Sequence, residues 1–91
     1  MPEETPKVVH ISSAVVRTRP EHMTEVAAAV AALPDTEIFH AEDGRIVVVM
    51  EGPDTGTLGS RLSEIALHDR VLSANMVYEQ IESLESLGEQ R

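Results

Sequence analysis

The chain has no cysteine, and its 91 residues include only one phenylalanine and one tyrosine. The absence of cysteine excludes disulfides, thiolate zinc ligands and thiol catalysis, and it fits a reducing compartment. With so few aromatic residues, the core must be built from Val, Ile, Leu, Ala and Met. A chain of this length forms one domain with a modest core.

Basic residues are also scarce, since 7 Lys and Arg stand against 16 Asp and Glu, for a formal net charge of −9. Nucleic-acid binding needs cations for the phosphates, so this balance argues against it, whereas a basic partner is favoured. No apolar run approaches the roughly 20 residues of a membrane span. The first seven residues are polar and hold two prolines. We therefore expect neither a signal peptide nor membrane insertion, and a cytoplasmic protein.

Hydrophobic periodicity divides the chain into six elements in the order β-α-β-β-α-β. This order predicts an α+β, ferredoxin-like sandwich with a four-stranded antiparallel sheet of strand order 4-1-3-2 and two helices on one face. Residues 1–7 are predicted to be a disordered lead-in, 8–80 a single domain and 81–91 a charged, frayed tail. The expected strands are 8–16, 36–41, 45–51 and 70–80, with helices from about 19 to 33 and about 55 to 68.

The start of the first helix can be read in two ways. Thr18 with Glu21 three residues later matches a capping box. Arg19 as the cap, with Pro20 at the first helical position, is equally compatible.

The turn at Asp43-Gly44 determines which side chains share a face of the sheet. A two-residue loop places Glu42 opposite Arg45, whereas a three-residue loop places Ala41 opposite Arg45. We favour the three-residue loop because it separates charged from apolar side chains better, and a slip of one residue would invert every position. It places Ile38, His40, Ile46, Val48 and Met50 under the helices, and Ala41 and Arg45 on the other face.

The same alternation assigns the outer strands. Val9, Ile11, Ser13 and Val15 are expected under the helices, with Leu72, Ala74, Met76 and Tyr78. The uncovered face has a largely apolar centre, which usually marks an interaction site. We expect a polypeptide to bind there, or a second copy of the chain in a weak homodimer. The candidate peptide-binding residues are His10, Ser12, Ala14, Val16, Glu37, Phe39, Val47, Val49, Glu51, Ser73, Asn75, Val77 and Glu79.

The sequence offers little for catalysis. The four histidines, His10, His22, His40 and His68, are not spaced like metal ligands. None is accompanied by the acid and nucleophile of a catalytic triad. We predict no enzymatic activity, no metal and no cofactor.

Several short segments resemble the NapD family. The resemblance begins with His10-Ile11-Ser12-Ser13-Ala14-Val15-Val16 and Arg19-Pro20-Glu21, and it extends over roughly residues 8–80. A larger aliphatic residue is common in that family where this chain has Ala14. The later matching segments are Leu33-Pro34, Glu37-Ile38, Asp43-Gly44-Arg45-Ile46-Val47-Val48-Val49, Glu51, Val71-Leu72-Ser73 and Met76-Val77-Tyr78.

The resemblance implies a cytoplasmic assembly chaperone of periplasmic nitrate reductase. Such a protein binds the twin-arginine signal peptide of the catalytic subunit and delays export until the molybdenum cofactor is inserted. The apolar part of that peptide would lie on the sheet, and its arginines would meet Glu37, Glu51 or Glu79. The alternative is a small-molecule-sensing regulatory domain of the same fold.

Overall fold

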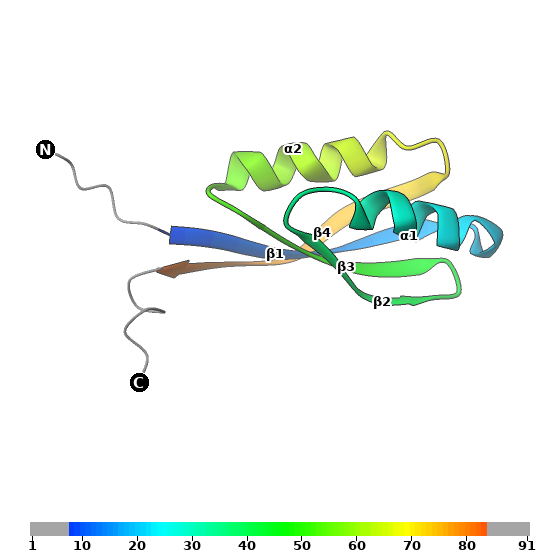
Figure 1. Cartoon of the computed structure of the whole chain (residues 1–91), viewed down its shortest axis with the longest axis horizontal. Coiled ribbons are helices and arrows are strands. Elements are labelled where there is room, and N and C mark those ends of the chain that lie inside the picture. The colour runs from blue at the N-terminus through cyan, green and yellow to red at the C-terminus, as the bar shows by residue number, and fades with distance from the viewer. Residues whose placement is uncertain (1–7, 84–91) are drawn as a thin grey trace, which may run out of the picture.

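A computed structural model describes residues 8–83, in which two helices cover one face of an antiparallel sheet (Figure 1). The strands lie in the order β2-β3-β1-β4, which is the predicted order 4-1-3-2 read from the other edge. The predicted fold is therefore confirmed. No helix within residues 8–83 is long and apolar enough to cross a membrane. The elements are β1 (Val8–Thr18), η1 (Pro20–His22), α1 (Met23–Ala31), β2 (Thr36–Glu42), β3 (Arg45–Gly52), α2 (Thr55–Ala66) and β4 (Val71–Ser83).

All four strands end later than predicted, and β1 and β4 extend furthest. β1 continues to Thr18, and β4 continues to Ser83. Ile81 pairs with His10 and Ser83 with Val8, so residues 81–83 belong to the sheet and not to a frayed tail. The predictions for residues 1–7 and 84–91 lie outside the described residues.

The first helical segment begins as the second of the two readings proposes. Arg19 is extended and precedes a turn of 3-10 helix with Pro20 at its first position, without a side-chain cap. Proline suits this position because its missing N–H would have no partner there. Thr18 does not form a capping box, since its hydroxyl donates instead to the carbonyl of Arg70 at 2.7 Å.

Helix α2 has a side-chain cap. The Asp54 carboxylate accepts a hydrogen bond from the backbone N–H of Thr57 at 2.7 Å. This bond holds the pKa of Asp54 below its ordinary value. A lowered pKa means that the cap stabilises the fold above the carboxyl's ordinary pKa, and that this stabilisation is lost as the pH falls through the lowered one.

The β2–β3 hairpin has a two-residue loop, so the predicted three-residue loop is wrong. Glu42 pairs with Arg45 and Ala41 with Ile46. The loop residues Asp43 and Gly44 have φ values of 53° and 81°. Two successive left-handed residues form a type I′ turn, whose twist matches that of the flanking strands.

A β-bulge at Phe39 explains why part of the predicted pattern nevertheless holds. The register shifts between Ile38, which pairs with Val48, and His40, which pairs with Val47. Ile38 therefore lies under the helices as predicted. His40, predicted under the helices, lies on the uncovered face. Ala41, predicted on the uncovered face, lies under the helices.

The core lies between the helices and the inner face of the sheet. Helix α1 packs over β2 and β3, and α2 packs over β1, β3 and β4. As predicted, Ile46, Val48 and Met50 lie under the helices, and the whole buried cluster consists of Ala14, Val16, Val26, Val30, Ile46, Val48, Met50, Leu58 and Ile65.

The alternation of β1 is the reverse of the predicted one. Ser12, Ala14 and Val16 are 0% exposed beneath the helices. The small side chains of Ser12 and Ala14, predicted on the uncovered face, lie instead beneath the helices. The residues predicted to be buried, Val9, Ile11, Ser13 and Val15, alternate with them and face the other way.

The predictions for β4 are correct in its middle and wrong at its ends. Ala74 pairs with Val16 and Met76 with Ala14, so both lie under the helices as expected. Leu72 and Tyr78, also expected there, are 68% and 58% exposed. The pairing of β1 with β4 shifts register between Ser13 and Ala14 and again between Arg17 and Thr18. These shifts interrupt the alternation of β4 next to Tyr78 and at Leu72.

Gly44 should be one of the least replaceable residues of the fold. A Cβ on Gly44 would lie 2.3 Å from the Thr18 carbonyl oxygen, and its φ of 81° disfavours any other residue. We expect Gly44→Ala to lower the free energy of unfolding by about 2 kcal/mol, measured by urea denaturation.

Gly59→Ala is the control for this prediction. Nothing lies within 4 Å of a Cβ at Gly59 in α2, and alanine favours helix, so stability should rise by up to about 1 kcal/mol. Equal destabilisation by both substitutions would contradict the role assigned to the turn.

Candidate functional site

The face of the sheet away from the helices, called the open face below, is the candidate site. Directly opposed residues of neighbouring strands share a face of the sheet. By this register, six of the predicted site residues lie on the open face: Glu37, Val47, Val49, Glu51, Ser73 and Asn75. Two more, Phe39 and Val77, are the extra residues of bulges in β2 and β4. The other residues on this face include Val9, Ile11, Ser13, Val15, Arg17, His40, Glu42, Arg45, Tyr78 and Gln80.

The middle of the open face is apolar. Val15 lies between Val47 of β3 and Asn75 of β4, and Val47 is flanked on its other side by His40. Val15 and Val47 are both half-buried although no helix covers them. Contiguous apolar surface of this kind is typical of a binding surface.

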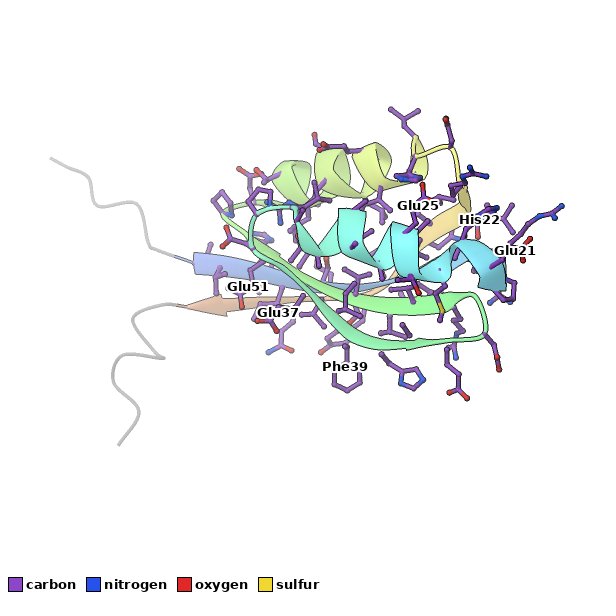
Figure 2. The ribbon with its side chains drawn as sticks, turned by 45° about the vertical axis from the view of Figure 1, so that its right-hand side comes forward. Glu21, His22, Glu25, Glu37, Phe39 and Glu51 are labelled. Carbon is purple, nitrogen blue, oxygen red and sulfur yellow. The ribbon has the colours of Figure 1, made fainter. Side chains whose placement is uncertain are left out.

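Bulges in both edge strands add larger hydrophobic side chains to this centre. Phe39 is the extra residue of the β2 bulge, is 77% exposed and points away from the helices (Figure 2). In β4, the bulge opposite Ser13 presents Val77 and Tyr78, which are 60% and 58% exposed. A bulge places two residues opposite one and so redirects a side chain.

One end of the open face is acidic. Asp35, Glu37 and Glu51 line a hollow of about 230 Å³ together with Thr36 and Val49. Glu37 and Glu51 lie at the same end of the sheet in Figure 2.

The backbone holds this acidic end in place. The N–H of Glu51 donates to the carbonyl of Asp35 at 3.0 Å, and Asp35 has a positive φ of 52°. Beneath it, Arg61 is 8% exposed and donates to the carbonyl oxygen of Glu51 at 2.8 Å. Within residues 8–83, none of the carboxylates of Asp35, Glu37 and Glu51 forms an ion pair within 4.0 Å. Asp35, Glu37 and Glu51 are all exposed, so a cationic ligand could reach their carboxylates from solvent.

The opposite end of the open face carries two arginines. Arg17 and Arg45 are directly opposed on β1 and β3. They line a hollow of about 380 Å³ with His40, Glu42 and Asp43. His40 Nε2 lies 3.1 Å from Glu42 Oε1, whereas neither arginine forms an ion pair within the described residues. The face thus changes along its length from acidic through apolar to arginine-bearing.

Two further predicted site residues, His10 and Glu79, lie on the helix side of the sheet. His10 Nδ1 lies 3.3 Å from Glu79 Oε2, and the Thr55 hydroxyl donates to the same oxygen at 2.9 Å. Thr55 Oγ1 also lies 3.3 Å from His10 Nδ1. Because one ring nitrogen serves both contacts, His10 cannot relay a proton between hydroxyl and carboxylate as in a catalytic triad. This cluster joins β1, β4 and the start of α2.

The remaining predicted residues, Ser12, Ala14 and Val16, have no surface on the open face. The residues that the prediction missed there include Ile11, Val15 and Arg17. Arg17 was the signal that could have found them, because it continues the alternation of Ile11 and Val15. A charged side chain on a central strand cannot face the core without a partner, so its parity identifies the open face.

In the part of the chain that the structure describes, no group of three or more His, Cys, Asp and Glu side chains could hold a metal ion.

Comparisons with known proteins agree on one family. A family model described as NapD protein matches residues 9–83. Chaperone NapD of Paracoccus pantotrophus is 39% identical over 75 residues, which are 82% of this chain and 67% of that protein. The solution structure of the E. coli Tat proofreading chaperone protein NapD has a TM-score of 0.73 at 26% identity, covering 79% of this chain and 78% of that one. The matched range includes both helices and every strand of the sheet.

Ser12 provides a test of the β1 alternation. Among the described residues, the Ser12 hydroxyl is buried without a hydrogen-bond partner. Removing an unsatisfied buried polar group is favourable, so Ser12→Ala should raise the free energy of unfolding by about 1 kcal/mol. The matched change on the open face, Ser13→Ala, should alter it by less than about 0.5 kcal/mol. Thermal and urea denaturation of both variants would measure these changes. Destabilisation by Ser12→Ala would contradict the assignment of Ser12 to the helix-covered face of β1.

Proposed function

Because the chain belongs to the NapD family, we propose that it is a cytoplasmic chaperone that matures a periplasmic nitrate reductase. It binds the twin-arginine signal peptide of the catalytic-subunit precursor and delays export until the cofactor is inserted. The observation that carries the proposal is the open face, with an apolar centre beside the exposed carboxylates of Asp35, Glu37 and Glu51. A cytoplasmic location follows, since the signal peptide is accessible there before export.

The apolar centre of the open face would supply most of the affinity. A micromolar complex requires about 8 kcal/mol, whereas an exposed ion pair contributes only about 0.2–1 kcal/mol. Burying one large apolar side chain contributes about 1.5–3 kcal/mol. Phe39, Val77 and Tyr78 have most of their surface exposed, and Val15 and Val47 add to it. The apolar side chains of the peptide are buried in the same contact and add to this energy, which must also offset the entropic cost of association.

The acidic end of the face would recognise the arginines. A guanidinium presents a planar fork of donors that a carboxylate can accept in pairs. Glu37 and Glu51 carry such carboxylates on neighbouring strands, and Asp35 lies beside them. Charge at this end would mainly increase the rate of encounter and select the peptide, since solvent screens each pair.

The open face is also where a weak homodimer would form. In that case the peptide and a second copy of the chain would compete for the same apolar residues. Peptide binding would then dissociate the dimer, and the two states would not coexist.

Phe39 should be a principal contact for the peptide. We expect Phe39→Ala to weaken binding of a nitrate reductase twin-arginine signal peptide about tenfold or more, because a large apolar contact is lost. Isothermal titration calorimetry would measure the Kd. Stability should change little, since Phe39 is 77% exposed.

Leu67→Ala is the matched control for Phe39→Ala. Leu67 is 82% exposed and follows α2 on the helix side, away from the open face. Its removal should change the Kd less than twofold. No saturable binding by the unchanged chain would refute the proposed function, and equal losses in both variants would show that the peptide binds elsewhere.

Glu37 and Glu51 should contribute through charge. We expect the double variant Glu37→Gln with Glu51→Gln to weaken binding about two- to twentyfold at low salt, with a smaller loss at high salt. Measuring the Kd at several salt concentrations tests this.

The charge-matched control is Glu64→Gln with Asp69→Asn, on the helix side. It changes the net charge equally and should leave the Kd nearly unaltered. If both double variants behave alike, only the overall charge of the chain matters. A peptide whose two arginines are replaced by glutamine should bind the unchanged chain more weakly. The Glu37 and Glu51 substitutions should not change the Kd of this altered peptide.

A further inference from the structure

We infer that the open face fixes the direction of the bound signal peptide, and that Arg17 and Arg45 determine that direction. The peptide's arginines lie at Glu37 and Glu51, and its carboxyl-terminal part lies at Arg17 and Arg45. This inference rests on the proposed function, and it assigns a role to two residues that peptide affinity alone does not require.

The order of charge along the open face matches only one direction of the peptide. A signal peptide carries its positive charges first, followed by an apolar region of about 7–15 residues. The face presents carboxylates at one end of β3, valines in its middle and an arginine pair at its other end. In the reverse direction, the peptide's arginines would meet Arg17 and Arg45, whose charges the carboxylates of Glu42 and Asp43 in the same hollow only balance, in place of the three carboxylates of the acidic end.

The lengths of the peptide and of the open face also agree. From Glu51 to Arg45, β3 advances by six residues, or about 20 Å at the usual strand rise. An apolar region of about 7–15 residues spans about 10–22 Å as a helix. A helical peptide would then also place the negative end of its dipole beside the two arginines.

Arg17 and Arg45 are like charges directly opposed across two strands, an arrangement that is destabilising. Glu42 is directly opposed to Arg45 on its other side, but neither arginine forms an ion pair within 4.0 Å among the described residues. Specific binding surfaces often include a repulsive element that disfavours the wrong arrangement. Arg17 and Arg45 provide this element against the reversed peptide.

Paramagnetic labels can determine the direction. Since the chain has no cysteine, a nitroxide can be attached through Pro53→Cys next to the acidic end, or through Leu72→Cys next to the arginine end. The pairs His10–Gly52 and Thr18–Val71 lie eight residues apart along β1, so the two labels are separated by about 26 Å. The probe is the twin-arginine signal peptide with ¹⁵N at its arginines.

The arginine signals of the bound peptide should broaden with the label at position 53 and remain sharp with the label at 72. The opposite result, or equal broadening by both labels, would overturn the inference while leaving the proposed function intact. Absence of binding in a titration of the unlabelled chain would overturn both.

The role of the arginine pair has its own test. In the double variant Arg17→Glu with Arg45→Glu, both ends of the face are acidic, so both labels should broaden the arginine signals. The control Arg19→Glu with Arg70→Glu makes the same change in net charge outside the open face and should keep the unchanged chain's pattern. A single direction retained in the first variant would overturn the role of Arg17 and Arg45.

Discussion

The packing of the helices onto β1 is the constraint on which the rest of the structure depends. Helix α2 crosses this central strand, and close packing requires small side chains beneath it. Ser12 and Ala14 meet that requirement and are 0% exposed. Because successive strand residues point to opposite faces, this choice also sends Ile11, Val15 and Arg17 to the open face. The composition of the open face is thus coupled to the packing of the core.

The bulges in β2 and β4 are the second determinant of the open face. In a regular strand, a residue such as Phe39 would have to alternate with its neighbours, and a slip of one would bury or expose them all. A bulge changes the alternation at one point only. The central strands β1 and β3 thus stay regular against each other and support the core, whereas the irregular edge strands present Phe39, Val77 and Tyr78.

The fold could be predicted from the sequence because hydrophobic periodicity and turn residues act locally. The type of each element, the strand order and the buried face of β3 followed from such signals. The alternation of β1 did not follow, because Ile11 and Val15 on one side and Val16 and Ala14 on the other are similarly apolar. Only Arg17 distinguishes the two sides, and it lay beyond the predicted end of the strand. The bulge at Phe39 leaves no local signature, so the face of His40 required the structure.

The distribution of charge on the open face fits the proposed function, in which a bound peptide must eventually be released. If deep, fully desolvated ion pairs held the arginines, breaking them would be costly, because a buried charge left unpaired is strongly destabilising. Glu37 and Glu51 are instead exposed, so each pair with an arginine contributes little and exchanges readily with water. Both described helices lie on the other face of the sheet, so neither covers the apolar centre (Figure 1). Under the proposed function, a peptide held in this way would be selected by its two arginines, aligned by the charges at both ends, and released without any rearrangement of the sheet.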